Sequence, residues 1–346
     1  FPNVSGIVEG KNLMAFKEML KSLNHLDTSV ADLMTQGFPL VGVMEETGVF
    51  EARQPRDVVY GADPQLLYMN ATEVRRNTMA NVTRSKVDKV SEAVYNQTHG
   101  GPEAETSKGW AKGPFTEEEI IARHGTSCVP CRRFGIDQGD KIRLIDDFSE
   151  NFHNACVTQY DKVTVDGVDA IASFIKLWSM CVEQARKDAQ GQWRFRMLLD
   201  SGETLVRVLH PQFRNDDEHL LGKCLDLEAA YRQLAVRPSH AHLSVICIKN
   251  PVSGRAEFFE VCAMPFGATA AVHGFNRVAI ALETIITKIF GIPCTYYFDD
   301  FTFIVPSTLG QELIEIVKEG LAFLGWKVKG GSKDVPLDKT FGALGV

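Results

Sequence analysis

The sequence has 346 residues, of which 45% are hydrophobic and 23% are charged, and its formal net charge is −7. This length exceeds what one hydrophobic core usually serves, so we expect two or three packed units. The acidic balance argues against a protein that coats nucleic acid by bulk electrostatics, although an enzyme with a local basic track stays open. Without an apolar run long enough to span a bilayer, we expect no membrane partner and an intracellular location, in the cytoplasm or the nucleus.

Residues 1–108 carry no catalytic pattern and are expected to form an N-terminal extension. Within it, apolar residues recur at helical spacing over residues 12–26 and predict a short amphipathic helix. The composition changes at residues 109–114. Soon after, Thr116 is followed three positions later by Glu119, which predicts a helix that begins with a capping box.

Helix and strand patterns are mixed along the rest of the chain, and we expect an α+β fold. Two short strands around a turn at residues 138–140 are expected between Cys131 and Phe148. An apolar face over residues 171–185 predicts a helix, with Asp166 as its N-cap. Further along we expect a strand ending at Asp226, strands at 243–248 and 256–261, a helix at 269–289, a hairpin at 294–305, a helix at 309–324 and a strand at 341–346.

The expected hairpin contains two adjacent carboxylates, Asp299 and Asp300, within a run of aromatic and β-branched residues. Carboxylates in such surroundings are costly to desolvate unless a cation or hydrogen bonds balance them. A chain reversal at the pair would place both at a rigid hairpin tip, which is how proteins present metal ligands. Taken alone, the motif is equally compatible with a solvated turn.

A third carboxylate, Asp226, ends an apolar strand 73 residues before Asp299 and is able to meet the hairpin on a neighbouring strand. Hard carboxylate oxygens suit two bridged Mg²⁺ ions, with Mn²⁺ as the alternative. No cluster of histidines points to zinc. Cys128 and Cys131 have zinc-ligand spacing, but no second pair follows, which favours a structural role.

These residues resemble the motifs of reverse transcriptases. Residues 226–231 look like polymerase motif A, and Tyr297 with Asp299 and Asp300 matches the Tyr-x-Asp-Asp motif C. Residues 264–269 resemble motif B, a Pro-x-Gly turn that opens a long helix. Residues 141–148 resemble the fingers motif. Residues 324–333 resemble motif D and residues 341–345 resemble motif E, and all these motifs follow the family's order.

The resemblance covers about residues 110–346 and implies a right-hand polymerase of the retroelement type. Fingers are expected at 109–225, with a helical insertion at about 160–215. A palm of antiparallel sheet backed by helices is expected at 226–346, with part of the fingers at about 237–265. The thumb is expected to be absent from this chain, so we expect a weak grip on the template.

The resemblance also assigns roles. Asp226, Asp299 and Asp300 are the expected catalytic acids, and they hold the metal ions together with the backbone carbonyl of Leu227. Lys333 is the expected general acid of motif D, in competition with Lys327 and Lys329. The expected nucleotide-binding residues are Arg133, Lys141, Arg143, Tyr231, Phe266, Gly267 and Lys333.

The implied activity is the addition of deoxynucleotides to a primer 3′-hydroxyl on an RNA or DNA template, with dNTPs as substrates. One alternative is an RNA-dependent RNA polymerase, which shares the palm and the metal ions; Tyr231 and the Tyr-x-Asp-Asp motif argue against it. A second alternative is a catalytically silent relative that only binds nucleic acid or a partner, and the intact acids argue against decay of the site. Neither a protein partner nor a role for the insertion is predicted.

Overall fold

In the computed structural model of the protein, the chain divides by packing into two compact units, residues 1–164 with 229–278 and residues 165–228 with 279–346. Both units contain helices and mainly antiparallel strands, in agreement with the predicted α+β class. No helix in the part of the chain that the structure describes is long and apolar enough to cross a lipid bilayer. The described residues are 2–139, 141–199, 201–214, 218–331 and 334–343.

The first unit is built around a five-stranded sheet with the order β3–β13–β12–β4–β5. Strands β4 and β12 run parallel, and the other neighbours run antiparallel. The strand predictions at 243–248 and 256–261 and the two strands predicted between Cys131 and Phe148 are confirmed. The strands are Ala111–Phe115 (β3), Pro130–Asp137 (β4), Ile142–Asp147 (β5), Val245–Lys249 (β12) and Ala256–Val261 (β13).

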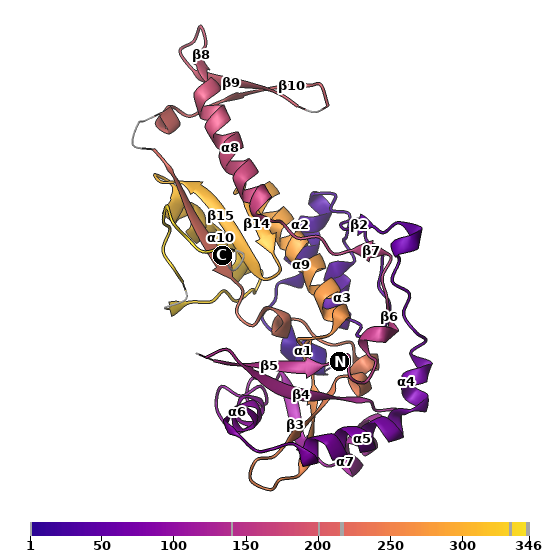
Figure 1. Ribbon diagram of the computed structural model, residues 1–346. Coiled ribbons are helices and arrows are strands. Elements are labelled where there is room, and N and C mark those ends of the chain that lie inside the picture. The colour runs from indigo at the N-terminus through magenta and orange to yellow at the C-terminus, as the bar shows by residue number, and fades with distance from the viewer. Residues whose placement is uncertain (1, 140, 200, 215–217, 332–333, 344–346) are drawn as a thin grey trace. The chain divides into compact units, whose positions relative to one another are not determined.

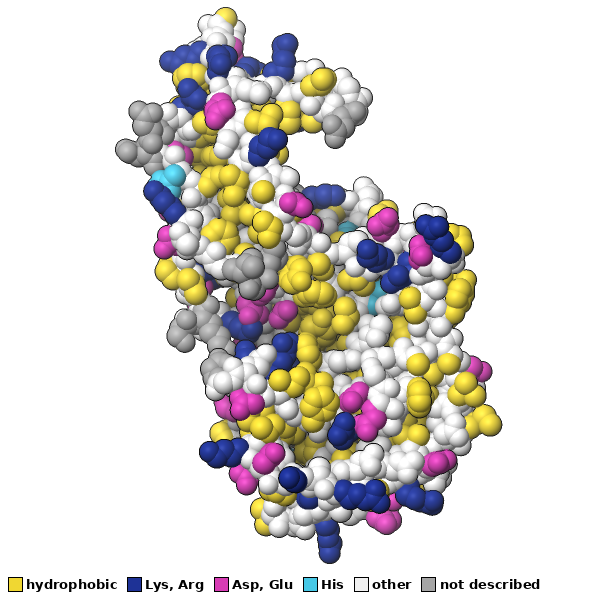
Figure 2. All heavy atoms as spheres, in the orientation of Figure 1, with side chains coloured by type: hydrophobic (Ala, Val, Ile, Leu, Met, Phe, Trp, Pro, Cys, Tyr) yellow, Lys and Arg dark blue, Asp and Glu magenta, His cyan; other side chains and the backbone are white. Residues whose placement is uncertain are grey.

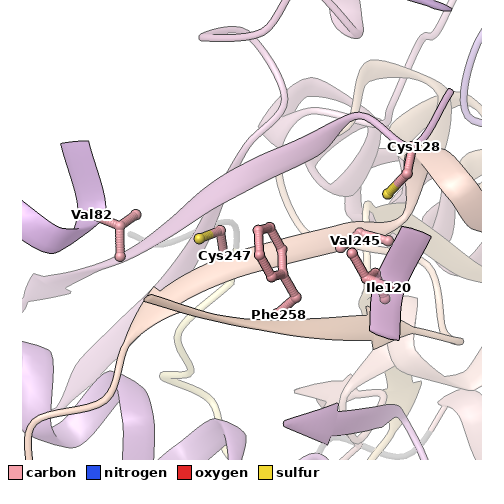
Figure 3. Close-up of a cluster of buried hydrophobic side chains, with 6 residues drawn as sticks. All are labelled: Val82, Ile120, Cys128, Val245, Cys247 and Phe258. Carbon is pink, nitrogen blue, oxygen red and sulfur yellow. The ribbon is translucent and has the colours of Figure 1, made fainter. Parts of the chain in front are cut away.

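Three helices lie against this sheet: α5 (Ala71–Arg84), α6 (Lys89–Thr98) and α7 (Glu117–His124) (Figure 1). Side chains from helices and strands meet in a buried cluster that removes apolar surface from water, the main stabilising contribution to such a layer. Burial in this cluster raises the pKa of the Cys128 thiol to about 12, so the side chain packs as a neutral apolar group. The cluster consists of Val82, Ile120, Cys128, Val245, Cys247 and Phe258 (Figure 3).

Helix α7 begins with the predicted capping box. The Thr116 hydroxyl accepts a hydrogen bond from the Glu119 amide at 3.2 Å, and the Glu119 carboxylate accepts one from the Thr116 amide at 2.8 Å. Two amides at the helix start that have no partner within the helix are thereby satisfied.

Residues 1–108 lie inside the first unit and contribute helices α1 to α6. The helix predicted over 12–26 is α2 (Leu13–Ser22), whose first turn is capped by the Asn12 side chain. Strand β1 pairs in parallel with β6, and β2 pairs antiparallel with β7. The remaining elements are α1 (Pro2–Ile7), α3 (Val30–Gln36), β1 (Gly42–Val43), β2 (Glu51–Ala52), α4 (Gln65–Met69), β6 (Val157–Thr158) and β7 (Asp161–Lys162), and the 3₁₀ helices Pro55–Asp57, Asn154–Cys156, Ala230–Gln233 and Pro238–Leu243.

The second unit contains an antiparallel sheet of three strands, β11 (Leu220–Asp226), β15 (Asp300–Pro306) and β14 (Cys294–Tyr297), in the order β11–β15–β14. Helix α10 (Gly310–Phe323) packs against β15 and confirms the helix predicted at 309–324.

The strand predicted at 341–346 is wrong over residues 341–343, which form no strand, and its remaining residues lie outside the described ranges. The Phe341 ring instead packs on Gly222 of β11, where an added Cβ atom would lie 1.8 Å from the ring. Glycine at position 222 therefore makes room for an aromatic side chain where a strand was expected.

The predicted insertion forms helix α8 (Val168–Gln184) and the sheet β10–β9–β8, with strands Thr204–Val208, Trp193–Leu198 and Arg186–Lys187 and a 3₁₀ helix at Pro211–Arg214. The helix is confirmed, but its N-cap is Gly167, so the assignment of Asp166 as the cap is wrong. The Asp166 carboxylate instead accepts a hydrogen bond of 3.1 Å from the Tyr296 amide of β14. Helix α9 (Thr269–Lys288), predicted at 269–289, begins in the first unit and ends in the second.

Candidate active site

The acidic hairpin forms as the sequence predicts. Tyr297 of β14 lies opposite Asp300 of β15, so only Phe298 and Asp299 form the loop between the strands. Phe298 has a φ of +53°, a left-handed conformation that is rare for a bulky residue. Unfavourable backbone conformations of this kind cluster at functional sites. The hairpin therefore presents Asp299 and Asp300 side by side in sequence at its tip.

Asp226 joins this pair through the pairing of β11 with β15. In that register Asp226 lies directly opposite Asp300. The next residue, Leu227, donates its amide hydrogen to the backbone carbonyl of Asp299 at 3.3 Å. The structure thus brings together the three carboxylates and the Leu227 backbone that the sequence assigned to one site.

Like charges directly opposite one another are unfavourable, and each disfavours the ionised form of its neighbour. Burial, followed by the charges of Asp226 and Asp299, raises the pKa of Asp300 to about 6. The neighbouring thiol of Cys224 also has its pKa raised, to about 12, first by burial and then by Asp300. The site therefore has a negative potential that favours a cation.

Lys329 supplies one positive charge. Its ammonium group contacts Oδ2 of Asp226, and its amide donates to the Asp226 carbonyl at 2.9 Å. The other carboxylate oxygen, Asp226 Oδ1, is buried without a hydrogen-bond partner. A buried acceptor in this state has lost its hydration without compensation.

The donor chemistry fits a hard divalent cation, because the carboxylates offer oxygen ligands and one of these oxygens is buried and unsatisfied. Within the described ranges, no three or more His, Cys, Asp or Glu side chains are arranged as a group able to hold a metal ion. Asp226 and Asp300, which the sequence analysis assigned to a metal site with Asp299, lie opposite each other in the sheet, and the Lys329 ammonium lies beside Asp226.

Three predicted nucleotide-binding residues meet in the first unit. The Arg143 guanidinium lies 4.1 Å from the ring centroid of Phe266. The Tyr231 ring meets Phe266 edge to face, with centroids 5.8 Å apart. On its other side Tyr231 stacks at 4.7 Å on Phe275 of α9. Phe275 was not predicted, although its place nearly two helical turns into the helix after motif B was a usable signal.

Gly267, also a predicted nucleotide-binding residue, fixes the turn before α9. Its φ is +115°, and an added Cβ atom would lie 2.3 Å from the Asp146 carbonyl oxygen. The Asp146 amide donates to the Phe266 carbonyl at 3.2 Å. Asn154 holds the other side, donating to the Gly267 carbonyl at 3.0 Å and accepting from the Thr269 amide at 2.8 Å. The turn is thus fixed between the end of β5 and the start of α9.

Arg133 does not join this cluster. Its side chain is fully buried and forms ion pairs of 2.6 Å with both Glu105 and Asp146. Arg232 pairs with the same two acids, at 2.6 Å and 3.5 Å. The two arginines outweigh the effect of burial and lower the pKa of Asp146. We therefore replace the expected triphosphate contact of Arg133 with a structural role in this buried network.

The two predicted lysines have different outcomes. Lys141 is exposed at the turn before β5, where its carbonyl accepts a hydrogen bond from the Gln138 amide at 2.9 Å. Lys333 lies outside the described residues. Its competitor Lys329 contacts the carboxylate of Asp226.

Together the fold and the site define a mixed α+β protein with an acidic hairpin set against the end of a neighbouring strand. Comparison with protein-family models gives no match, and comparison with curated proteins gives none either.

Proposed function

We propose that the protein is an RNA-directed DNA polymerase of the reverse-transcriptase type, from a retroelement. The observation that carries the proposal is the position of Asp226 opposite Asp300 at the tip of the Tyr297–Asp300 hairpin. A single acidic turn has many explanations. A strand-end carboxylate that meets an acidic hairpin, in a chain that carries five polymerase-like motifs in order, has far fewer.

In this proposal the acidic cluster carries the chemistry. Asp226 and Asp299, with the Leu227 carbonyl, would hold two Mg²⁺ ions, and Asp300 would add to the negative field that retains them. When bound, the ions activate the primer 3′-hydroxyl and stabilise the leaving pyrophosphate. Lys329 holds a proton on Nζ beside Asp226, and we assign to it the general-acid role expected of motif D.

The Arg143 cluster binds the incoming dNTP. The guanidinium pairs with triphosphate oxygens by charge-assisted hydrogen bonds and is held in place by the Phe266 ring. The Tyr231 ring, supported by Phe275, lies beneath the sugar and excludes a 2′-hydroxyl. Steric exclusion favours deoxynucleotides and hence the DNA polymerase over the RNA polymerase alternative.

The test is primer extension by the full chain on an RNA template with Mg²⁺ and either dNTPs or rNTPs. We expect extension with dNTPs, none with Asp299→Asn, and full activity with Lys339→Gln, a control at an exposed lysine of the same unit. Extension only with rNTPs would favour the RNA polymerase. A folded chain that binds primer–template but never extends it would favour the silent relative.

A further inference from the structure

The second half of the insertion, which follows helix α8, is basic. Residues 186–214 contain six Lys or Arg and three Asp or Glu, a net charge of +3 within a protein of net charge −7. These residues include the sheet β8–β9–β10 at the C-terminal end of helix α8 (Figure 1). Figure 2 shows Lys and Arg side chains gathered over this end of the second unit.

The strand register places three of the four arginines in the sheet on one face, and the fourth, Arg207, lies opposite Phe195 on the other face. Arg194 lies between Arg186 of β8 and Val208 of β10, and Arg196 lies opposite Val206. Residues that face one another across an antiparallel sheet share a face, so all five side chains project from the same side. All five are exposed. We call these five residues the arginine face.

The opposite side of the sheet carries the half-buried Trp193 together with the exposed Lys187 and Arg207. Trp193 is flanked by two cations, Lys187 at 5.5 Å and Arg214 at 4.7 Å from its ring centroid. Phe213 meets Trp178 of α8 edge to face at 5.1 Å. These contacts hold the sheet against helix α8, so the arginine face has a fixed backbone beneath it.

The charges of the arginine face are only partly balanced within the protein. Asp188 pairs with Arg194 at 2.5 Å. Arg186 donates only to backbone carbonyls, those of Glu183 and Ala185, and among the described residues no carboxylate forms an ion pair with Arg186 or Arg196. Two arginines directly opposite each other repel, and a polyanion removes that repulsion.

The spacing of the face matches a nucleic-acid strand. Arg194 and Arg196 are two residues apart on β9, which places their Cα atoms about 6.8 Å apart at about 3.4 Å per residue. The rise of about 3.4 Å per phosphate along a duplex axis is only one component of the through-space separation of neighbouring phosphates, which is larger, so the two guanidiniums are placed to reach neighbouring phosphates of one strand. The exposed valines beside them on β10 offer apolar contacts to sugars.

We infer that the arginine face binds the sugar–phosphate backbone of nucleic acid. This inference goes beyond the proposed function, since such binding needs neither the acidic hairpin nor a nucleotide. A protein partner would need a complementary acidic surface, and an anionic lipid surface would not use the match to phosphate spacing. Binding to anionic vesicles would identify the lipid surface, and a face that binds only a protein partner would show no arginine-dependent affinity for either oligonucleotide.

The experiment measures binding of the full chain to a fluorescein-labelled RNA of about 20 nucleotides, and to its RNA–DNA duplex, by anisotropy over a series of KCl concentrations in EDTA. The variants are Arg196→Gln and Arg194→Gln/Arg196→Gln. The matched control is Arg56→Gln, because the Arg56 side chain is 86% exposed and belongs to the other unit. Thermal melts check that each variant keeps the wild-type fold.

We expect Kd near 0.1 M KCl to rise about fivefold for each phosphate-contacting arginine removed, and the slope of log Kd against log[KCl] to fall by about 0.7–0.9 each time. Arg56→Gln leaves both unchanged. Wild-type affinity and slope in the folded double variant would overturn the inference. So would an equal loss in Arg56→Gln, or binding to anionic vesicles with none to either oligonucleotide.

The outcome is separate from that of the proposed function. Binding is measured without metal ions or nucleotides, so a chain that never extends a primer can still show the arginine-dependent affinity. Conversely, primer extension that persists in the double variant with unchanged oligonucleotide affinity would refute only the arginine face.

Discussion

The two carboxylate oxygens of Asp226 have different surroundings. Oδ2 contacts the Lys329 ammonium, while Oδ1 is buried with no partner. A buried carboxylate at the end of an apolar strand lowers the stability of the fold. Such costly charged groups are found most often at functional sites. Lys329 offsets part of it and lowers the pKa of Asp300, against the larger upward effect of burial.

Replacing Lys329 tests this balance directly. We expect Lys329→Gln to lower the free energy of unfolding by roughly 0.5–1 kcal/mol in EDTA at pH 8, because the ion pair is partly exposed and the repulsion between Asp226 and Asp300 then lacks a counter-charge. Urea unfolding of the wild type and the variant measures the change. The exposed Lys339→Gln serves as the control, and equal loss in both would show that the contact with Asp226 contributes nothing.

Tyr231 is the residue whose role separates the two polymerase alternatives. We expect Tyr231→Val to raise the use of rNTPs far more than it changes the use of dNTPs, because the ring no longer collides with a 2′-hydroxyl. The measurement is the ratio of kcat/KM for dNTP over rNTP, with the melting temperature recorded alongside.

Phe275→Leu provides the control for Tyr231, since it truncates the buried ring on which Tyr231 stacks. A Tyr231 that only packs the core would lose stability by the usual few kcal/mol for an aromatic truncation and depress both substrates alike. An unchanged ratio in Tyr231→Val would refute the exclusion of rNTPs by this side chain.

At the scale of elements, Glu260 ties β13 to helix α7. Its carboxylate accepts from Arg123 at 3.0 Å and lies 3.3 Å from the His124 ring. Burial alone would raise the pKa of Glu260, but the contacts with His124 and Arg123 outweigh it and lower the pKa from 4.5 to about 2.

This shift predicts a stability loss in acid. A carboxylate whose pKa is lower in the folded state stabilises the fold above the unfolded-state pKa, and the contribution disappears as pH falls through the folded-state pKa. Between pH 7 and about pH 3, the ionised Glu260 therefore accounts for a loss of about 2 kcal/mol. Glu260→Gln removes that component, so urea unfolding of the variant should show a smaller difference between the two pH values. An identical pH dependence in both proteins would contradict the assignment.

At the scale of the whole molecule, segments far apart in the sequence complete each unit. Glu105, from the stretch predicted as an extension, balances Arg133 of β4 and Arg232. Removing one partner from such a buried network leaves an uncompensated charge, so residues 1–108 are integral to the first unit.

A metal ion bound at the acidic hairpin should stabilise the whole second unit. We expect Mg²⁺ to raise the melting temperature of the wild type, because a ligand bound only by the folded state stabilises it by mass action. Lys329→Gln should show a larger rise, since a competing cation is gone, and Asp226→Asn little or none. Melts in EDTA and in Mg²⁺ measure this, with NaCl at equal ionic strength as the control. A rise in Asp226→Asn equal to that of the wild type would place the effect elsewhere.

The amino-acid sequence by itself determined the local helices and the hairpin, and it also determined which carboxylates belong to the acidic site. Helices α7, α9 and α10 and the hairpin follow from periodicity and caps, which depend on neighbouring residues. Asp226 was assigned to the same site because a strand end and a hairpin tip are able to pair, and the register of β11 with β15 places it there.

Tertiary structure decided what depends on distant partners. Arg133 has the sequence context of a nucleotide contact, yet Glu105 and Asp146 bury it as an ion pair. Asp166 has the position of a helix cap, yet it hydrogen-bonds Tyr296, 130 residues away. The same applies to the arginine face, because only the register of β8, β9 and β10 shows which arginines share a side. The role of a charged side chain depends on the group that it contacts, and the tertiary fold determines which distant residue that is.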